Sequence, residues 1–269
     1  DFNMKLLNIA CGSRYHPAWI NIDFFAHTKE VKKVNILKGL PFEDGTIDAI
    51  YSSHLLEHLT KKQAKNLLIE CNRVLKKNGI IRITVPDLEN ICREYLRILH
   101  DNSNSISLKK YSWITVELLD QLVRTKSGGE MIKIYEEVSA EKDFELAKYI
   151  NQRVGVELIA KDSTKKKKSI TFNKMGTMFF YFYIKLISKL IPGSIRDMVF
   201  VNTTIGEKHQ WMYDKFSISM ALKDAGFNDI SMEQFNTSRI SDFQSYLLDI
   251  NPDGTPYKGV SSLYAEAVK

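Results

Sequence analysis

Two histidines and a glutamate stand close together in the stretch SSHLLEHL, residues 52–59, in the order H-x-x-E-H. Imidazole and carboxylate groups bind transition metals, and they are also the groups that most often move protons in catalysis. His54, Glu57 and His58 are therefore candidates for a metal site or for acid–base chemistry. The secondary structure on either side of the stretch distinguishes a metal site from an acid–base site, because the backbone determines where the three side chains point.

A metal-dependent hydrolase is one alternative, since H-x-x-E-H is the signature of one class of zinc peptidases. That chemistry needs both histidines one turn apart on a helix. Here residues 47–53 predict a strand, and Thr60 with Gln63 forms the capping box T-x-x-Q that begins the next helix. HLLEH is thus expected in the connection, at the strand edge where open α/β sheets bind ligands.

A second candidate site follows the first predicted strand, which runs into the turn ACGS at residues 10–13. Gly12 lets a ligand approach the backbone, and Asp23, at the end of the next predicted strand, suits the paired hydroxyls of a ribose. Only one glycine of the dinucleotide-binding pattern is present, and the acidic residue follows too soon after it. We therefore do not expect a dinucleotide-dependent dehydrogenase.

The hydrophobic pattern of the two ends of the chain predicts one α/β core. Apolar runs alternate with turns and one amphipathic helix over residues 1–95, and residues 206–269 return to this character. The strands are expected at residues 5–10, 18–23, 31–36, 47–53, 79–86, 228–235 and 261–269. The last two follow a helix at residues 214–227, which suits an antiparallel addition to a mostly parallel sheet.

Residues 96–205 differ from the rest and predict a mostly helical insertion or lid. Its helices are expected at residues 91–102, 107–125 and 143–154, and the helix that precedes it is expected to include Lys76 and Lys77 in its last turn. The segment also holds KDSTKKKKS, residues 161–169, followed by an apolar aromatic run. Beside four lysines, this run indicates either the core of a lid or a contact with an anionic membrane surface over residues 161–191.

Composition indicates a soluble globular protein, with 44% hydrophobic and 26% charged residues in a chain of 269. The three cysteines, Cys11, Cys71 and Cys92, show no C-x-x-C spacing, which favours reduced thiols and a cytoplasmic location. The net charge of +6 suits anionic partners without identifying one.

The order and spacing of these motifs resemble class I S-adenosylmethionine-dependent methyltransferases. The resemblance lies in LLNIACGSRYHPAWINIDF, in VNILKGLPFEDGTIDAIYSSHLLEHL and in ECNRVLKKNGIIRITVPD. More narrowly, GEKHQWMYDKFSISMALKDAGF and the final 32 residues resemble methyltransferases found with sugar and surface-polysaccharide genes. The resemblance implies a Rossmann-like sheet, mostly parallel with one antiparallel strand, and S-adenosyl-L-methionine as cofactor.

Carried over by position, the resemblance also implies a cofactor site. The methionine end of the cofactor would lie over the first turn, the ribose on Asp23, and the adenine against the turn after the third strand, with Ser53 nearby. The implied cofactor-binding residues are Ala10, Cys11, Gly12, Ser13, Arg14, Asp23, Asn35, Ile36, Leu37 and Ser53. Arg14 would pair with the cofactor carboxylate.

A hydroxyl acceptor needs a group that takes its proton. The candidates are His54, His58, Asp87 and His209, with His209 preferred because it returns to the sheet edge after the insertion. Some methyltransferases of small RNAs and quinone precursors resemble the H-x-x-E-H stretch with E-x-x-E-H and hold a divalent metal. His54 replaces the first glutamate here, which disfavours Mg²⁺, and no metal is predicted.

The expected activity is O-methylation of a carbohydrate, either a nucleotide sugar or a surface glycan. The alternatives are an RNA or small-molecule methyltransferase, the metal-dependent hydrolase, and a non-catalytic module in a glycan-assembly complex. A nucleic-acid partner is not expected. The carbohydrate acceptor rests on the resemblance, because a fold does not fix a substrate.

Overall fold

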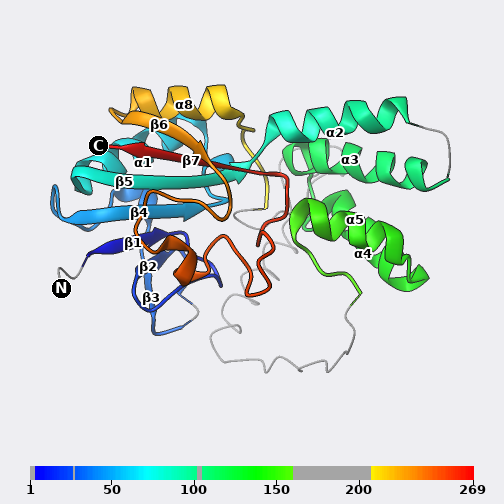
Figure 1. The fold of residues 1–269 in the computed structure, drawn as a ribbon, viewed down its shortest axis with the longest axis horizontal. Coiled ribbons are helices and arrows are strands. Elements are labelled where there is room, and N and C mark those ends of the chain that lie inside the picture. Colours follow the sequence, from blue (N-terminus) through cyan, green and yellow to red (C-terminus); the bar gives the residue numbers. More distant parts are fainter. Residues whose placement is uncertain (1–3, 27, 102–104, 160–206) are drawn as a thin grey trace, which may run out of the picture.

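The computed structural model of the chain describes residues 4–26, 28–101, 105–159 and 207–269. A seven-stranded sheet has the order β3-β2-β1-β4-β5-β7-β6 (Figure 1). The strands are β1 (Leu6–Ile9), β2 (Ile20–Asp23), β3 (Val31–Lys33), β4 (Ile47–Ser53), β5 (Leu75–Pro86), β6 (Asn228–Glu233) and β7 (Ser262–Val268). Within this sheet β7 alone runs antiparallel to its neighbours, β5 and β6. The predicted Rossmann-like sheet, mostly parallel with one antiparallel strand, is confirmed.

The register of the central strands brings the candidate residues to one edge of the sheet. Ile9, near the end of β1, pairs with Ile22 of β2 on one side and with Ser52 of β4 on the other. The three strands are parallel, so the turn after β1, the carboxyl end of β2 and the connection after β4 lie side by side. This is the edge at which open α/β sheets bind ligands.

Two helices cover one face of the sheet, α1 (Lys61–Val74) and α8 (Lys215–Asp224). The predicted capping box is present, because Thr60 and Gln63 satisfy each other's backbone N–H groups. The predicted end of α1 was wrong. The helix stops at Val74, because Leu75 takes an extended conformation and pairs with Ile47, so Lys76 and Lys77 belong to β5.

Loops rather than long helices cover the opposite face. A second apolar cluster there joins Trp19, Tyr51 and Phe243, the last of which lies in the short 3-10 helix η3 (Phe243–Tyr246). The fully buried Arg82 of β5 anchors this covering, since Nε donates to Asp249 Oδ2 at 2.7 Å and Nη1 donates to Glu266 Oε1 at 2.8 Å. The segment from residue 234 to residue 261 is thereby fixed against the sheet.

Four further helices lie beyond the carboxyl ends of β4 and β5 (Figure 1). They are α2 (Leu88–His100), α3 (Ser105–Val123), α4 (Gly129–Glu141) and α5 (Phe144–Val154). The predicted boundary between residues 95 and 96 falls within α2, and α4 was not predicted. No helix in the described part of the chain is long and apolar enough to cross a membrane. Residues 161–191, for which a membrane contact was predicted, lie outside the described residues.

Candidate functional site

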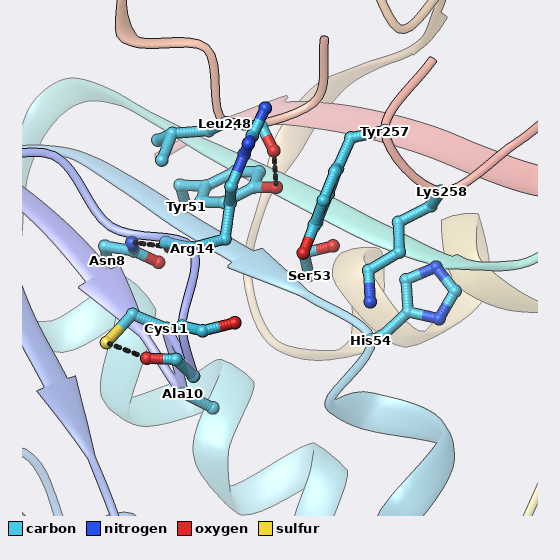
Figure 2. A pocket seen from close by; sticks show the side chains of 12 residues that line it. Asn8, Ala10, Cys11, Arg14, Tyr51, Ser53, His54, Leu248, Tyr257 and Lys258 are labelled. Carbon is cyan, nitrogen blue, oxygen red and sulfur yellow. Dashed lines mark hydrogen bonds between the residues drawn. The ribbon is translucent and has the colours of Figure 1, made fainter. Parts of the chain in front are cut away.

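A cavity of about 240 Å³ opens at the carboxyl ends of β1 and β4 (Figure 2). Its walls come from three separate parts of the chain: the first strand and turn, the end of β4, and the C-terminal loop. The lining residues are Asn8, Ala10, Cys11, Gly12, Ser13, Arg14, Tyr51, Ser53, His54, Leu248, Tyr257 and Lys258. The two halves of the core therefore build one site.

The turn after β1 presents open backbone to this cavity. Gly12 has φ +54°, and a Cβ placed on it would meet nothing within 4 Å. The left-handed conformation explains the glycine, and the empty space lets a ligand approach closely. Asp23 supports the turn, because its Oδ2 accepts a hydrogen bond from Gly12 N–H at 2.9 Å and its Oδ1 accepts one from Phe25 N–H at 2.9 Å.

The structure brings together some of the predicted cofactor residues and leaves others apart. Residues 10–14 and Ser53 line the cavity, whereas Asp23 adjoins it through Gly12. Asn35, Ile36 and Leu37 do not line it. Asn35 caps the 3-10 helix η1 (Ile36–Lys38) by accepting from Leu37 N–H, Ile36 is buried in the core, and the Leu37 side chain faces solvent.

Three buried polar atoms of cavity-lining residues have no partner among the described residues: Asn8 Oδ1, Arg14 Nε and Ser53 Oγ. The first two have opposite hydrogen-bonding roles. They offer an acceptor suited to an ammonium group and a donor suited to a carboxylate, the two charged ends of an amino acid. Arg14 also donates through Nη2 to the Ile250 carbonyl at 2.7 Å, and its guanidinium lies 4.1 Å from the centre of the Tyr257 ring.

Sequence reasoning missed five of the lining residues: Asn8, Tyr51, Leu248, Tyr257 and Lys258. Asn8 carried a usable signal, because a polar residue inside an otherwise apolar buried strand calls for a partner. Tyr257 and Lys258 carried none, since a long loop places them. Cys11 also lines the cavity, where burial raises the pKa of its thiol to about 12 and thus keeps it protonated.

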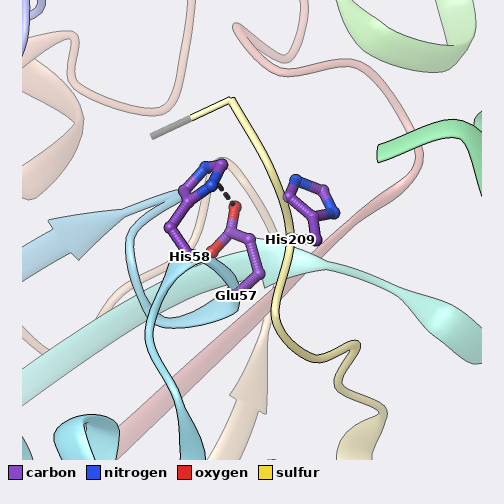
Figure 3. A group of neighbouring side chains, drawn as sticks. All are labelled: Glu57, His58 and His209. Carbon is purple, nitrogen blue, oxygen red and sulfur yellow. Dashed lines mark ion pairs between the residues drawn. The ribbon is translucent and has the colours of Figure 1, made fainter. Parts of the chain in front are cut away.

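Three of the four predicted catalytic residues, His54, His58 and His209, lie around one buried carboxylate, Glu57. Figure 3 shows two of them, His58 and His209, beside it. The H-x-x-E-H stretch lies in the connection between β4 and α1, as predicted, and includes the 3-10 helix η2 (Leu56–His58). His54 has φ +52°. Its Nδ1 lies 3.3 Å from Glu57 Oε1, and its Nε2 lies 3.1 Å from Ser262 Oγ. His54 is thus the histidine that both lines the cavity and contacts Glu57.

His58 and His209 complete the group on the other side of Glu57. His58 Nε2 lies 3.8 Å from Glu57 Oε1, its Nδ1 donates to the Lys208 carbonyl at 3.1 Å, and its ring packs edge-on against that of His209. His209, the base that the sequence favoured, is 5% exposed and does not line the cavity. Burial lowers its pKa to about 4.

Glu57 is fully buried yet ionised. Burial alone would raise its pKa, but the hydrogen bond to His54 and the attraction of the three imidazoles outweigh burial and lower the pKa to about 2. The backbone carbonyl of Glu57 also accepts from the N–H groups of Gln210 and Trp211. Glu57 therefore joins the connection after β4 to the segment that leads into α8.

Asp87, the fourth predicted catalytic residue, lies apart from both the cavity and the histidines. Its carboxylate caps α2 by accepting from Asn90 N–H at 3.2 Å. Burial raises the pKa of this carboxyl, against the lowering effect of the capping hydrogen bonds. The contacts of Asp87 are those of a helix cap.

Comparison with known proteins finds one family match and several distant structural likenesses. The family described as a methyltransferase domain matches residues 7–83, from β1 into β5. A methyltransferase from Archaeoglobus fulgidus is 13% identical over 99% of this chain and 86% of that one, with a TM-score of 0.40. One from Mesorhizobium loti is 12% identical over 99% and 91%, with a TM-score of 0.38. At these values neither likeness carries an inference about substrate. A search of curated proteins found no match.

The matched segment includes the turn that lines the cavity. It begins in β1 and ends in β5. The reversed β7 beside β5 completes the sheet predicted for this class. Residues 7–83 thus match a methyltransferase domain, for which S-adenosylmethionine is the cosubstrate.

Proposed function

We propose that this methyltransferase transfers the methyl group to a hydroxyl of a carbohydrate, a nucleotide sugar or a growing surface glycan. One observation supports a hydroxyl acceptor most directly. His54 lines the same cavity as the glycine turn, and the buried Glu57 carboxylate lies 3.3 Å from its Nδ1 atom. The sugar itself rests on the resemblance of both ends of the chain to methyltransferases of surface-polysaccharide gene groups.

The cavity-lining residues divide into two sets under this proposal. The turn at residues 10–14, with Asn8 Oδ1 and Arg14 Nε, would hold the amino-acid end of the cosubstrate, and Asp23 would meet its ribose. Asn35, Ile36 and Leu37 remain the proposed adenine contacts, although they lie outside the cavity. His54, Tyr257 and Lys258 would face the acceptor.

When bound, S-adenosylmethionine supplies an electrophilic methyl group on a sulfonium. The acceptor oxygen forms the new C–O bond as the C–S bond breaks, so its alignment contributes much of the rate. Glu57 beside Nδ1 of His54 favours the tautomer that carries its proton there, which leaves Nε2 as the acceptor nitrogen. Nε2 lies 3.1 Å from Ser262 Oγ, so the acceptor hydroxyl would take the place of the Ser262 hydroxyl when it gives its proton to Nε2. We therefore assign the proton-accepting role to His54 in place of His209.

The test is methylation of a panel of nucleotide sugars and glycan oligosaccharides, followed by mass spectrometry, with wild type and His54→Gln. We expect the variant to lose at least about a hundredfold in rate, the low end of general-base catalysis. Cosubstrate affinity, measured by calorimetry, should stay unchanged. His100→Gln, at an exposed position on α2, is the matched control.

Two results would contradict the proposal. Full activity of His54→Gln would remove His54 as the base. Methylation of RNA or of small non-sugar hydroxyl compounds in preference to every carbohydrate tested would remove the acceptor class. RNA binding that weakens steeply with salt would favour the nucleic-acid alternative.

A further inference from the structure

Glu57, His58 and His209 form a compact group of metal-ligating side chains (Figure 3). One ligand atom from each residue lies within 4.8 Å of the others. Ligands held at about 2.1 Å from a tetrahedral ion lie about 3.4 Å apart. The three ligand atoms would therefore need to approach one another by at most about 1.4 Å, which is within the reach of small side-chain rotations.

The carboxylate of Glu57 is set up to receive a cation. The side chain is fully buried, and its closest polar contact among the described residues is Nδ1 of His54, 3.3 Å from Oε1, which leaves most of the acceptor capacity of the carboxylate unused. Burying a charge without full compensation costs several kcal/mol. Its neighbours are imidazoles, which are neutral unless protonated, so a divalent ion would supply the missing positive charge.

The ring of His58 already has the orientation of a metal ligand. Its Nδ1–H donates to the backbone carbonyl of Lys208, which fixes the tautomer and leaves the lone pair of Nε2 directed toward Glu57. A ligating histidine typically donates its second N–H to a backbone carbonyl or carboxylate in this way. The side chain of His58 is 17% exposed, which gives an ion a route from solvent.

We propose that Glu57, His58 and His209 bind a divalent transition-metal ion, for which Zn²⁺ is the best fit. Two imidazoles and one carboxylate favour zinc over Mg²⁺ and Ca²⁺, which prefer all-oxygen sites. The ion would join two segments that are 151 residues apart at His58 and His209. It would thus act as a clamp that holds the segment after residue 206 against the connection between β4 and α1.

Backbone hydrogen bonds already join the segment that carries His209 to the rest of the core. His209 N–H donates to the Gln121 carbonyl at 2.8 Å, and Gln210 N–H donates to the Glu57 carbonyl at 2.6 Å. The ion would strengthen an existing junction, so binding should stabilise the folded protein by mass action. This clamp differs from the zinc-peptidase arrangement, in which His54 and His58 would be ligands and His209 would have no part.

The experiment is titration of the EDTA-treated full chain with Zn²⁺ and separately with Mg²⁺, followed by calorimetry and thermal unfolding. We expect one Zn²⁺ per chain, a higher melting temperature with Zn²⁺, and no matching effect of Mg²⁺. His209→Asn and His58→Asn should each weaken zinc binding at least about tenfold. His54→Gln and the exposed control His100→Asn should retain it.

Two further measurements show whether cysteine thiols bind the ion instead and whether each variant still folds. Co²⁺ in place of Zn²⁺ gives visible absorption whose pattern reports nitrogen and oxygen ligands rather than sulfur, and near-ultraviolet circular dichroism checks the fold of each variant. Zinc binding that survives in His209→Asn but not in His54→Gln would overturn the proposal. So would equal binding in all variants, or no stoichiometric zinc binding by wild type. None of these results depends on the acceptor, so the methyl-transfer proposal is tested separately.

Discussion

Two buried polar atoms without partners are the main support for the proposed position of the cosubstrate in the cavity. Asn8 Oδ1 and Arg14 Nε are buried on its wall without a partner in the described part of the chain. Leaving a buried polar atom unpaired costs about 1–3 kcal/mol. A protein can keep unpaired buried atoms at a site where a ligand supplies their partners. The amino-acid end of S-adenosylmethionine has an ammonium donor for the oxygen and a carboxylate acceptor for the nitrogen.

Asp23→Asn tests the residue that joins the turn to the ribose position. The carboxylate accepts from two backbone N–H groups, whereas an amide has one acceptor oxygen and must turn a donor toward one of them. We expect affinity for S-adenosylmethionine to fall at least about tenfold by calorimetry, with a stability loss of about 1 kcal/mol. Asp44→Asn, at an exposed acid, is the control. Unchanged affinity in Asp23→Asn would remove Asp23 from the site.

Helices and strands that have a short sequence pattern of their own could be predicted. Contacts between residues far apart in the sequence could not. The capping box at Thr60 and the seven strands along the chain follow from short patterns, and both are confirmed. The helix α4 was missed although Met131, Ile134, Tyr135 and Val138 have helical spacing, because it begins with two glycines, one at the N-cap and one at its first position. The group around Glu57 could be predicted only in part, since contacts across the fold bring His209 beside it.

Arg82→Met tests the element that fixes the C-terminal loop over the cavity. Arg82 holds two buried carboxylates, Asp249 and Glu266, which the variant would leave without their cation. Removing one partner of a buried ion pair costs about 3–5 kcal/mol, so the free energy of unfolding in urea should fall by about that amount. Affinity for S-adenosylmethionine should fall with it, because Leu248 adjoins Asp249. Arg93→Met, in an exposed pair on α2, should change stability by less than about 0.5 kcal/mol.

At the scale of the whole molecule, the cavity joins parts of the chain that are far apart in sequence. Residues 8–14 form one wall and residues 248–258 contribute to another, and Arg14 connects them through the Ile250 carbonyl and the Tyr257 ring. The family match ends at residue 83 and therefore includes only the first of these walls. A ligand that fills the cavity must contact both ends of the chain, so its binding should be coupled to global unfolding.

This coupling predicts that S-adenosylhomocysteine, the demethylated product, raises the melting temperature in proportion to the logarithm of its concentration. A ligand that binds the folded state alone adds about 2.7 kcal/mol at a hundred times its dissociation constant. Arg14→Met should abolish most of the shift, because it removes both the cavity donor and the contact with residues 250 and 257. Arg93→Met should show the full shift. A shift of equal size in Arg14→Met, measured by scanning calorimetry, would place the ligand elsewhere on the protein.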